Sequence, residues 1–106
     1  MRSELEALQH WYESQCDGDW EHEFGVKIGT LDNPGWMVDI DLEGTSLEDR
    51  AFPPINDVEP ERDWISCDVR ENTFRGRGGP LMLGRILRVF LDWAHEEQGQ
   101  STSATV

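Results

Sequence analysis

The sequence predicts an α+β fold, a four-stranded antiparallel sheet with an N-terminal and a C-terminal helix packed on one of its faces. Segments near both ends of the chain repeat apolar residues at helical spacing, whereas the segments between them alternate apolar and polar residues as strands do. A chain of 106 residues is also the size of one domain with a single core. We therefore predict one domain over residues 1–98 and a disordered tail over residues 99–106.

The first helix is predicted over residues 4–15. Ser3, followed by Glu6 three residues later, has the capping-box pattern, in which each side chain accepts a hydrogen bond from a backbone N–H of the other residue. Apolar side chains then recur at helical spacing, at Leu5, Leu8, and Trp11 or Tyr12. Gly18 tolerates a positive φ, so the acidic turn around it is expected to stop the helix.

Alternation of apolar and polar residues marks four strands, at residues 24–30, 36–42, 63–69 and 73–77. The first two are joined by Asn33-Pro34-Gly35-Trp36, which fits a type II turn, so they are predicted to form a hairpin. Residues 43–62 contain three prolines and little periodicity, and we expect an exposed loop there. The sheet face away from the helices should then show Lys27, Met37, Asp39, Asp41, Trp64, Asp68, Arg75 and Arg77.

The last helix is predicted to open at Gly78-Gly79-Pro80, because proline is well tolerated in a first helical turn. Its apolar stripe consists of Leu83, Ile86, Leu87, Phe90 and Ala94. Gly99 is expected to end this helix, and the tail after it has too few apolar residues to pack.

The charge is strongly negative, with 22 acidic against 9 basic residues and a net of −13. Such a surface repels nucleic acid and anionic membranes, whose phosphates require lysine and arginine, and it attracts basic proteins. Acidity that serves only solubility is the alternative.

Three features of the sequence bear on where the protein is found. No stretch approaches the roughly 18 apolar residues of a membrane helix, and the N-terminus lacks the apolar run of a signal peptide. Two cysteines make no disulfide framework. We therefore expect a cytoplasmic protein with reduced thiols.

The search for chemistry finds no complete motif, so no metal and no cofactor is expected. Asp17 to His22 starts like a calcium loop but lacks the glycine and glutamate that such a loop requires. Arg75 to Gly79 lacks the ending of a phosphate-binding P-loop. Cys67 alternates with apolar residues, which predicts a buried thiol. One functional hypothesis is a small cysteine- or carboxylate-dependent enzyme, similar to a hydrolase or a sulfurtransferase. Such an enzyme would use Cys67 or the acids of Asp17 to His22, and it is the alternative to the binding function described next.

Several stretches resemble one known family. They are Trp11-Tyr12, Gln15 to His22, the turn Thr30 to Trp36 and the strand end Asp39 to Leu42, with thinner likeness at Asp63-Trp64, Phe74, Gly78 to Pro80 and the last helix. In these residues the sequence is similar to the immunity protein 53 family of bacterial toxin–immunity systems. The resemblance implies a non-catalytic protein that binds and neutralises a cognate toxin. It does not indicate which residues contact that toxin.

A cognate toxin with a basic, nuclease-like domain would fit the charge, and we expect a monomer that occludes it in the cytoplasm. Two candidate surfaces are predicted, an acidic turn and the open sheet face. The partner-binding candidates are Asp17, Asp19, Trp20, Glu21 and Glu23 in the turn, and Asp39, Asp41, Trp64 and Asp68 on the sheet. Exposed tryptophans often anchor interfaces, but Trp20 folded back over the edge of the hairpin is an equal alternative.

Overall fold

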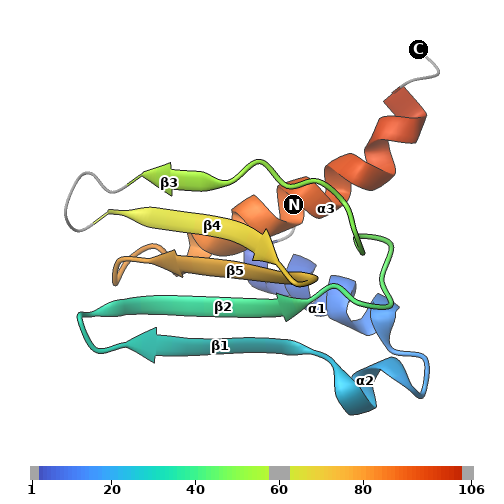
Figure 1. Cartoon of the computed structure of the whole chain (residues 1–106), viewed down its shortest axis with the longest axis horizontal. Coiled ribbons are helices and arrows are strands. Elements are labelled where there is room, and N and C mark those ends of the chain that lie inside the picture. Colours follow the sequence, from blue (N-terminus) through green and yellow to red (C-terminus); the bar gives the residue numbers. More distant parts are fainter. Residues whose placement is uncertain (1–2, 58–62, 104–106) are drawn as a thin grey trace.

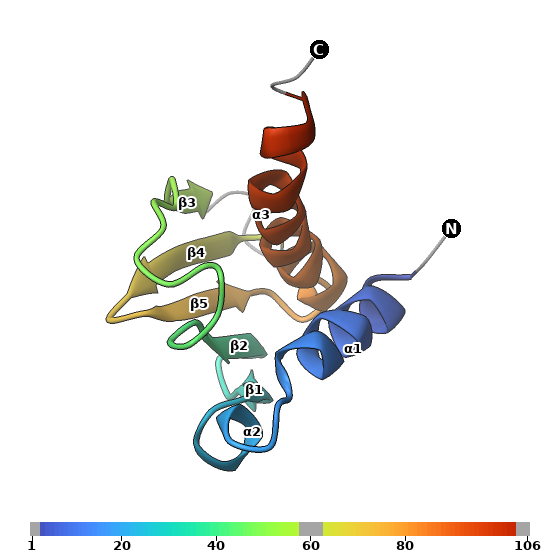
Figure 2. The ribbon, with the colours of Figure 1, turned by 90° about the vertical axis from the view of Figure 1, so that its right-hand side faces the viewer.

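A computed structural model describes residues 3–57 and 63–103. In chain order the elements are α1 (Glu4–Gln15), α2 (Trp20–Glu23), β1 (Val26–Leu31), β2 (Gly35–Asp41), β3 (Ile55–Asp57), β4 (Ile65–Arg70), β5 (Thr73–Gly78) and α3 (Leu83–Ser103) (Figure 1). The strands form one antiparallel sheet in the order β1-β2-β5-β4-β3. Helices α1 and α3 pack together on one face of it (Figure 2). The predicted α+β fold class is confirmed.

The sheet has one strand more than the sequence predicted. β3 lies inside the segment expected to be a loop, and it pairs with β4 through three residues, Ile55 to Asp57. Three residues are too few to show an alternating pattern, and the preceding Pro53-Pro54 suggests a loop. The short helix α2 was missed for the same reason, because a single helical turn has no periodicity.

Helix α1 has the predicted bounds, and local hydrogen bonds explain them. The backbone N–H of Glu6 donates to Ser3 Oγ at 3.1 Å, and the backbone N–H of Ser3 donates to Glu6 Oε1 at 3.3 Å. The predicted capping box is therefore present and satisfies two N–H groups that a helix start leaves unpaired.

The core lies between the helices and the sheet, and aromatic rings fill its centre. The Phe90 ring of α3 lies 4.9 Å from Trp11 of α1 and 5.2 Å from Phe74 of β5, measured between ring centroids. The Phe52 ring, from the segment before β3, lies 5.6 Å from Phe74 and 5.1 Å from Trp93. These contacts connect α1, α3, the sheet and the long connection between β2 and β3.

Two glycines of β5 allow α3 to approach the sheet closely. A Cβ atom at Gly76 would lie 2.3 Å from Ile86 Cγ2, and one at Gly78 would lie 3.0 Å from Ile86 Cδ1. Both positions are buried on the helix side of the sheet. The arginine-glycine run of β5 therefore serves helix packing, and it does not form a loop at the start of a helix.

Helix α3 differs from its predicted bounds at both ends. It begins at Leu83, three residues after Pro80, and its backbone continues past Gly99 to Ser103. Gly99 therefore does not end the helix. Residues 104–106, the last part of the predicted tail, lie outside the described residues.

We expect Phe90→Ala to lower the free energy of unfolding by about 3–5 kcal/mol, because it removes a fully buried ring and leaves a cavity. Denaturant titration at equilibrium measures this change. Leu81→Ala is the control, since Leu81 is 86% exposed and its replacement should leave the midpoint unchanged. An unchanged midpoint for Phe90→Ala would contradict the packing of α3 on the sheet.

Gly76→Ala should destabilise the protein by about 1–3 kcal/mol, because its methyl group would overlap Ile86 Cγ2. In the Ile86→Ala background the same substitution should be less harmful, since Cγ2 is absent there. A double-mutant cycle measures this coupling. Gly84→Ala, in an exposed first turn of α3 with nothing within 4 Å of its Cβ, should be neutral or slightly stabilising. Additive losses from the first two substitutions would contradict the close approach.

Candidate functional site

The acidic turn before β1 is held by its own carboxylates. Asp17 Oδ1 accepts hydrogen bonds of 2.9 Å from the backbone N–H groups of Asp19 and Trp20. The Glu21 carboxylate accepts from the N–H groups of Asp17 and Gly18 at 3.0–3.2 Å. These bonds hold the pKa of Asp17 below its usual value, chiefly through the N–H of Trp20. The pKa of Glu21 is also lowered, by hydrogen bonds from its own N–H and from those of Asp17 and Gly18. Both side chains therefore carry their charge at neutral pH.

Trp20 belongs to the core. Of the two alternatives for this side chain, an exposed interface anchor or a ring folded back on the protein, the structure shows the second. Its side chain is 6% exposed, and its indole Nε1–H donates to the carbonyl oxygen of Glu43 at 2.8 Å. Its ring lies 6.2 Å from that of Trp11. Trp20 cannot anchor a partner from this position. It instead joins α2 to the segment that follows β2.

That contact brings a second acidic segment beside the turn. We call residues 17–23 and 43–50 together the acidic end; they hold seven carboxylates and one arginine, Arg50. Figure 2 looks onto this end, with α2 below the loop that follows β2. Six of the seven acidic residues are exposed, and Glu21 is half-buried. Sequence reasoning missed Glu43, Glu48 and Asp49, because contacts between distant parts of the chain, such as that of Trp20 with Glu43, place them here.

The open sheet face carries the predicted charged residues, but its acids are already paired. Arg75 donates to Asp68 through Nε at 3.0 Å and through Nη2 at 2.8 Å, and Arg77 Nη1 donates to Asp39 at 2.9 Å. The hydrogen bonds from Arg75 lower the pKa of Asp68. Asp41 accepts from the backbone N–H of Gly25 at 2.9 Å. This face is therefore close to electrically neutral and is not the acidic surface that we expected.

The two predicted surfaces meet only at one corner of the sheet. Asp41 adjoins the acidic end through its bond to Gly25, two residues after Glu23. Trp64 precedes Ile65, which pairs with Gly78, and Gly78 pairs in turn with Trp36 beside the β1–β2 turn. Trp64 therefore lies at the opposite end of the sheet from the acidic end. It is half-buried.

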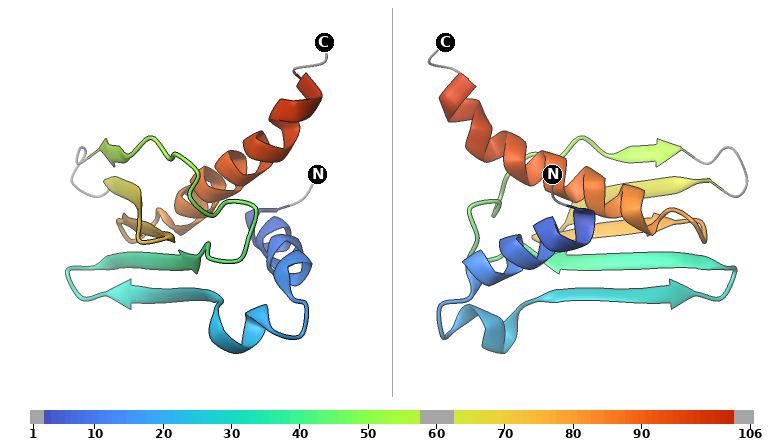
Figure 3. Two further views of the ribbon diagram at one scale, coloured as in Figure 1. Left: turned by 45° about the vertical axis from the view of Figure 1, so that its right-hand side comes forward. Right: turned by 180° about the vertical axis from the view of Figure 1, so that it is seen from behind.

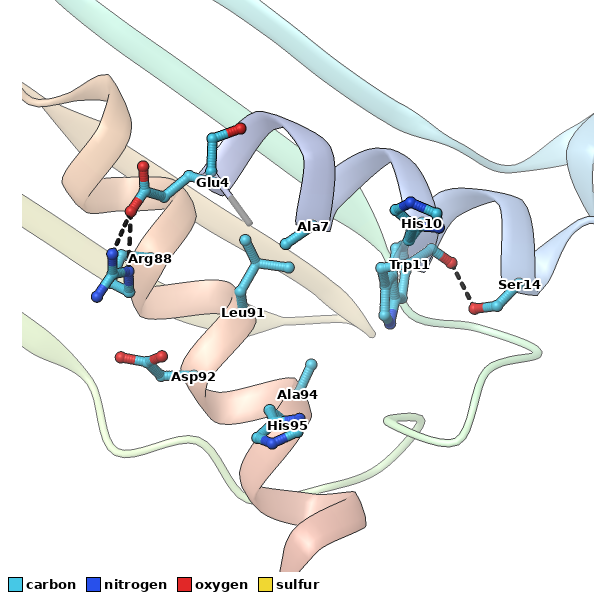
Figure 4. Close-up of a pocket in the computed structure, with 11 residues that line it drawn as sticks. Glu4, Ala7, His10, Trp11, Ser14, Arg88, Leu91, Asp92, Ala94 and His95 are labelled. Atoms are coloured by element: carbon cyan, nitrogen blue, oxygen red, sulfur yellow. Dashed lines mark hydrogen bonds and ion pairs between the residues drawn. The ribbon is translucent and has the colours of Figure 1, made fainter. Parts of the chain in front are cut away.

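A groove of about 670 Å³ lies between α1 and α3 on the outer side of the helix layer (Figure 4). Ala7, Trp11, Leu91 and Ala94 contribute its apolar part. An ion pair between Glu4 and Arg88, with Nε–Oε2 at 3.0 Å, joins the two helices at one end of it. Sequence reasoning missed this groove, since the spacing of residues within one helix does not show how two helices diverge. Within the described ranges, no three histidine, cysteine, aspartate or glutamate side chains come together to hold a metal ion.

Comparison with known families shows which protein family the chain belongs to. A model of the family described as immunity protein 53 matches residues 5–95. The chain belongs to the immunity protein 53 family. Proteins of an immunity family neutralise a cognate toxin by binding it, and they are generally non-catalytic. No curated protein and no solved structure matches the chain.

The geometry of Cys67 agrees with a non-catalytic immunity protein. The thiol is unpaired and buried in β4, and burial raises its pKa to about 11. A nucleophilic cysteine requires the opposite, an accessible thiol with a lowered pKa. The described part of this immunity protein also contains no helix that is both long and apolar enough to cross a membrane.

We expect Cys67 to react with a disulfide reagent at pH 7.5 at least about a hundredfold more slowly than an ordinary exposed thiol, because it is buried and protonated. The Cys16→Ser variant isolates this thiol. The absorbance of the thiolate that the reagent releases measures the rate. Unfolding in guanidinium should restore ordinary reactivity. The Cys67→Ser variant, which keeps the half-buried Cys16, is the control. Fast reaction of native Cys67 would contradict a buried, non-catalytic thiol.

Proposed function

We propose that this immunity protein occludes a basic, nuclease-like toxin domain in the cytoplasm, with its acidic end against the basic surface of the toxin. One observation carries the proposal, the seven carboxylates gathered at a single end of the sheet beside one arginine. A surface of one sign speeds the encounter with a partner of the opposite sign. Nucleases are basic where they hold the phosphates of their substrate.

The placement of the remaining charges supports this choice of surface. On the open sheet face, Asp39 and Asp68 each form an ion pair with an arginine, so a partner would have to compete with partners already present. Exposed Asp19 and Glu23 have no side-chain hydrogen bond or ion pair in the described part of the chain. Their charges are therefore available to a partner.

The surface of this small domain is large enough for an interface of ordinary size. A stable interface buries roughly 800 Å² on each partner. The chain exposes 7107 Å², so about a tenth of its surface would be covered. The two unpaired cysteines are compatible with a reducing compartment such as the cytoplasm.

We expect Asp19→Asn/Glu23→Gln to slow association with the toxin several-fold at low salt and to change dissociation little, because exposed charges act mainly on the encounter. The binding partner is an inactive form of the cognate toxin domain. Surface-based binding kinetics at low and high salt measure both rates. The difference should disappear at high salt, where such charges are screened.

Asp63→Asn/Asp92→Asn is the matched control, since it removes the same charge from exposed positions outside the acidic end. Its association rate should stay near that of the unmodified protein. Equal slowing by both pairs would show that only total charge matters. No slowing by the Asp19/Glu23 pair would exclude the acidic end as the contact surface.

A further inference from the structure

The two edges of the sheet are built differently. β3, at one edge, has three residues and follows Pro53-Pro54. β1, at the other edge, has six residues, no proline, and regular pairing with β2 from Val26 to Leu31. Proteins usually blunt an edge strand by shortening it or by adding prolines and charges, because its unpaired backbone groups attract other strands. β1 carries one charge, Lys27, which lies opposite Asp39 of β2.

Two hydrogen bonds show which backbone groups of β1 point outward. The N–H of Asp41 donates to the carbonyl oxygen of Gly25 at 3.0 Å, and the N–H of Leu42 donates to that of Asn72 at 2.8 Å. Successive residues of a strand direct their backbone groups to opposite sides, so the odd-numbered residues of β2 bond towards β1 and the even-numbered ones towards β5. The residues of β1 opposite the even-numbered ones therefore turn their N–H and C=O groups away from β2; they are Val26, Ile28 and Thr30.

Exposed apolar side chains accompany this edge. Ile28 points to the helix side of the sheet, yet it is 42% exposed, because the helices cover the inner strands and leave β1 outside them (Figure 3). The flank of α1 away from α3 carries Leu5 and Tyr12, which are 59% and 39% exposed. The Tyr12 ring lies 6.1 Å from Trp20, close to the start of β1. A strand added to β1 would cover part of this apolar surface.

We propose that β1 is the docking edge for a β-strand of the toxin domain, a proposal that rests on the proposed function. The outward groups of Val26, Ile28 and Thr30 would bond the backbone of the added strand, as in other cases of strand addition. The strand would carry basic residues at the end that meets the acidic end, since β1 begins three residues after Glu23. A second copy of this chain is a poorer occupant, because each copy has a net charge of −13.

Amide hydrogen exchange followed residue by residue by NMR tests the proposal on the unmodified protein. In the free protein the amides of Val26, Ile28 and Thr30 should exchange fast, and those of Lys27 and Gly29 should exchange slowly. Addition of the inactive toxin domain should slow exchange of the three outward amides by at least about tenfold. Unchanged exchange at these three positions would overturn the proposal.

Thr30→Pro provides a second test, because it removes an outward N–H and leaves the pairing with β2 intact. Gly29, which precedes it, tolerates the restriction that proline imposes on its neighbour, and proline is accepted on the open side of edge strands. Dissociation of the toxin domain should accelerate about tenfold, since one backbone hydrogen bond is lost. Thr30→Val keeps the N–H and should stay within about twofold. If Thr30→Pro does not fold, the exchange experiment decides.

The outcomes separate the two proposals. Slow association of Asp19→Asn/Glu23→Gln together with unchanged exchange at β1 would overturn the docking edge and leave the acidic end supported. A toxin domain that does not bind the unmodified protein would overturn both. Slow exchange at Val26, Ile28 and Thr30 in the free protein, with a dimer in sedimentation, would assign the edge to a second copy and overturn the toxin strand.

Discussion

The close approach of α3 to β5 is the constraint on which the rest of the structure depends. Gly76 and Gly78 leave no side chain between the strand and Ile86, so the helix lies directly over the middle of the sheet. Phe90 then reaches Phe74 and Trp11, and α1 packs beside α3. Because α3 packs on β5 and β2, β1 lies beside the covered strands at the edge of the sheet and remains partly bare. The exposure of Ile28 therefore follows from the same packing that builds the core.

The charged side chains also differ between the two surfaces. The acids Asp39 and Asp68 of the open sheet face form ion pairs with arginines, whereas the acidic end holds mainly carboxylates. Arg75 lies opposite Asp68 in the register of β4 and β5, so the central acid of the open face has a bidentate partner. The acidic end has few cations of its own, and Asp17 and Glu21 use their charge to hold the turn. Charge repulsion there is tolerated because backbone N–H groups stabilise these two carboxylates. Such an arrangement keeps the remaining carboxylates available to a partner.

Sequence reasoning was accurate for several local signals, but the type II turn at Asn33-Pro34-Gly35-Trp36 was wrong, because Gly35 has no positive φ and already belongs to β2. The capping box at Ser3 and Glu6 predicted the start of α1, and alternation predicted which residues of β2 and β5 face away from the helices. Features that depend on distant contacts were missed. The burial of Trp20 requires the carbonyl group of Glu43, and the neutrality of the open face requires the register that pairs Arg75 with Asp68. β3 was missed because three residues cannot show a period.

The acidic end and the β1 edge would contribute to binding in different ways. Carboxylates act over a Debye length of about 8–10 Å, so they would guide the approach of a basic partner before contact. Backbone groups such as those of Thr30 act only within about 3 Å, so they resist separation after docking. Backbone bonds are also insensitive to the side chains of the added strand, so specificity must come from the neighbouring groups. Ile28, Tyr12 and the acidic end lie beside the edge and differ in chemistry, so in the proposed complex they would together distinguish one toxin strand from another.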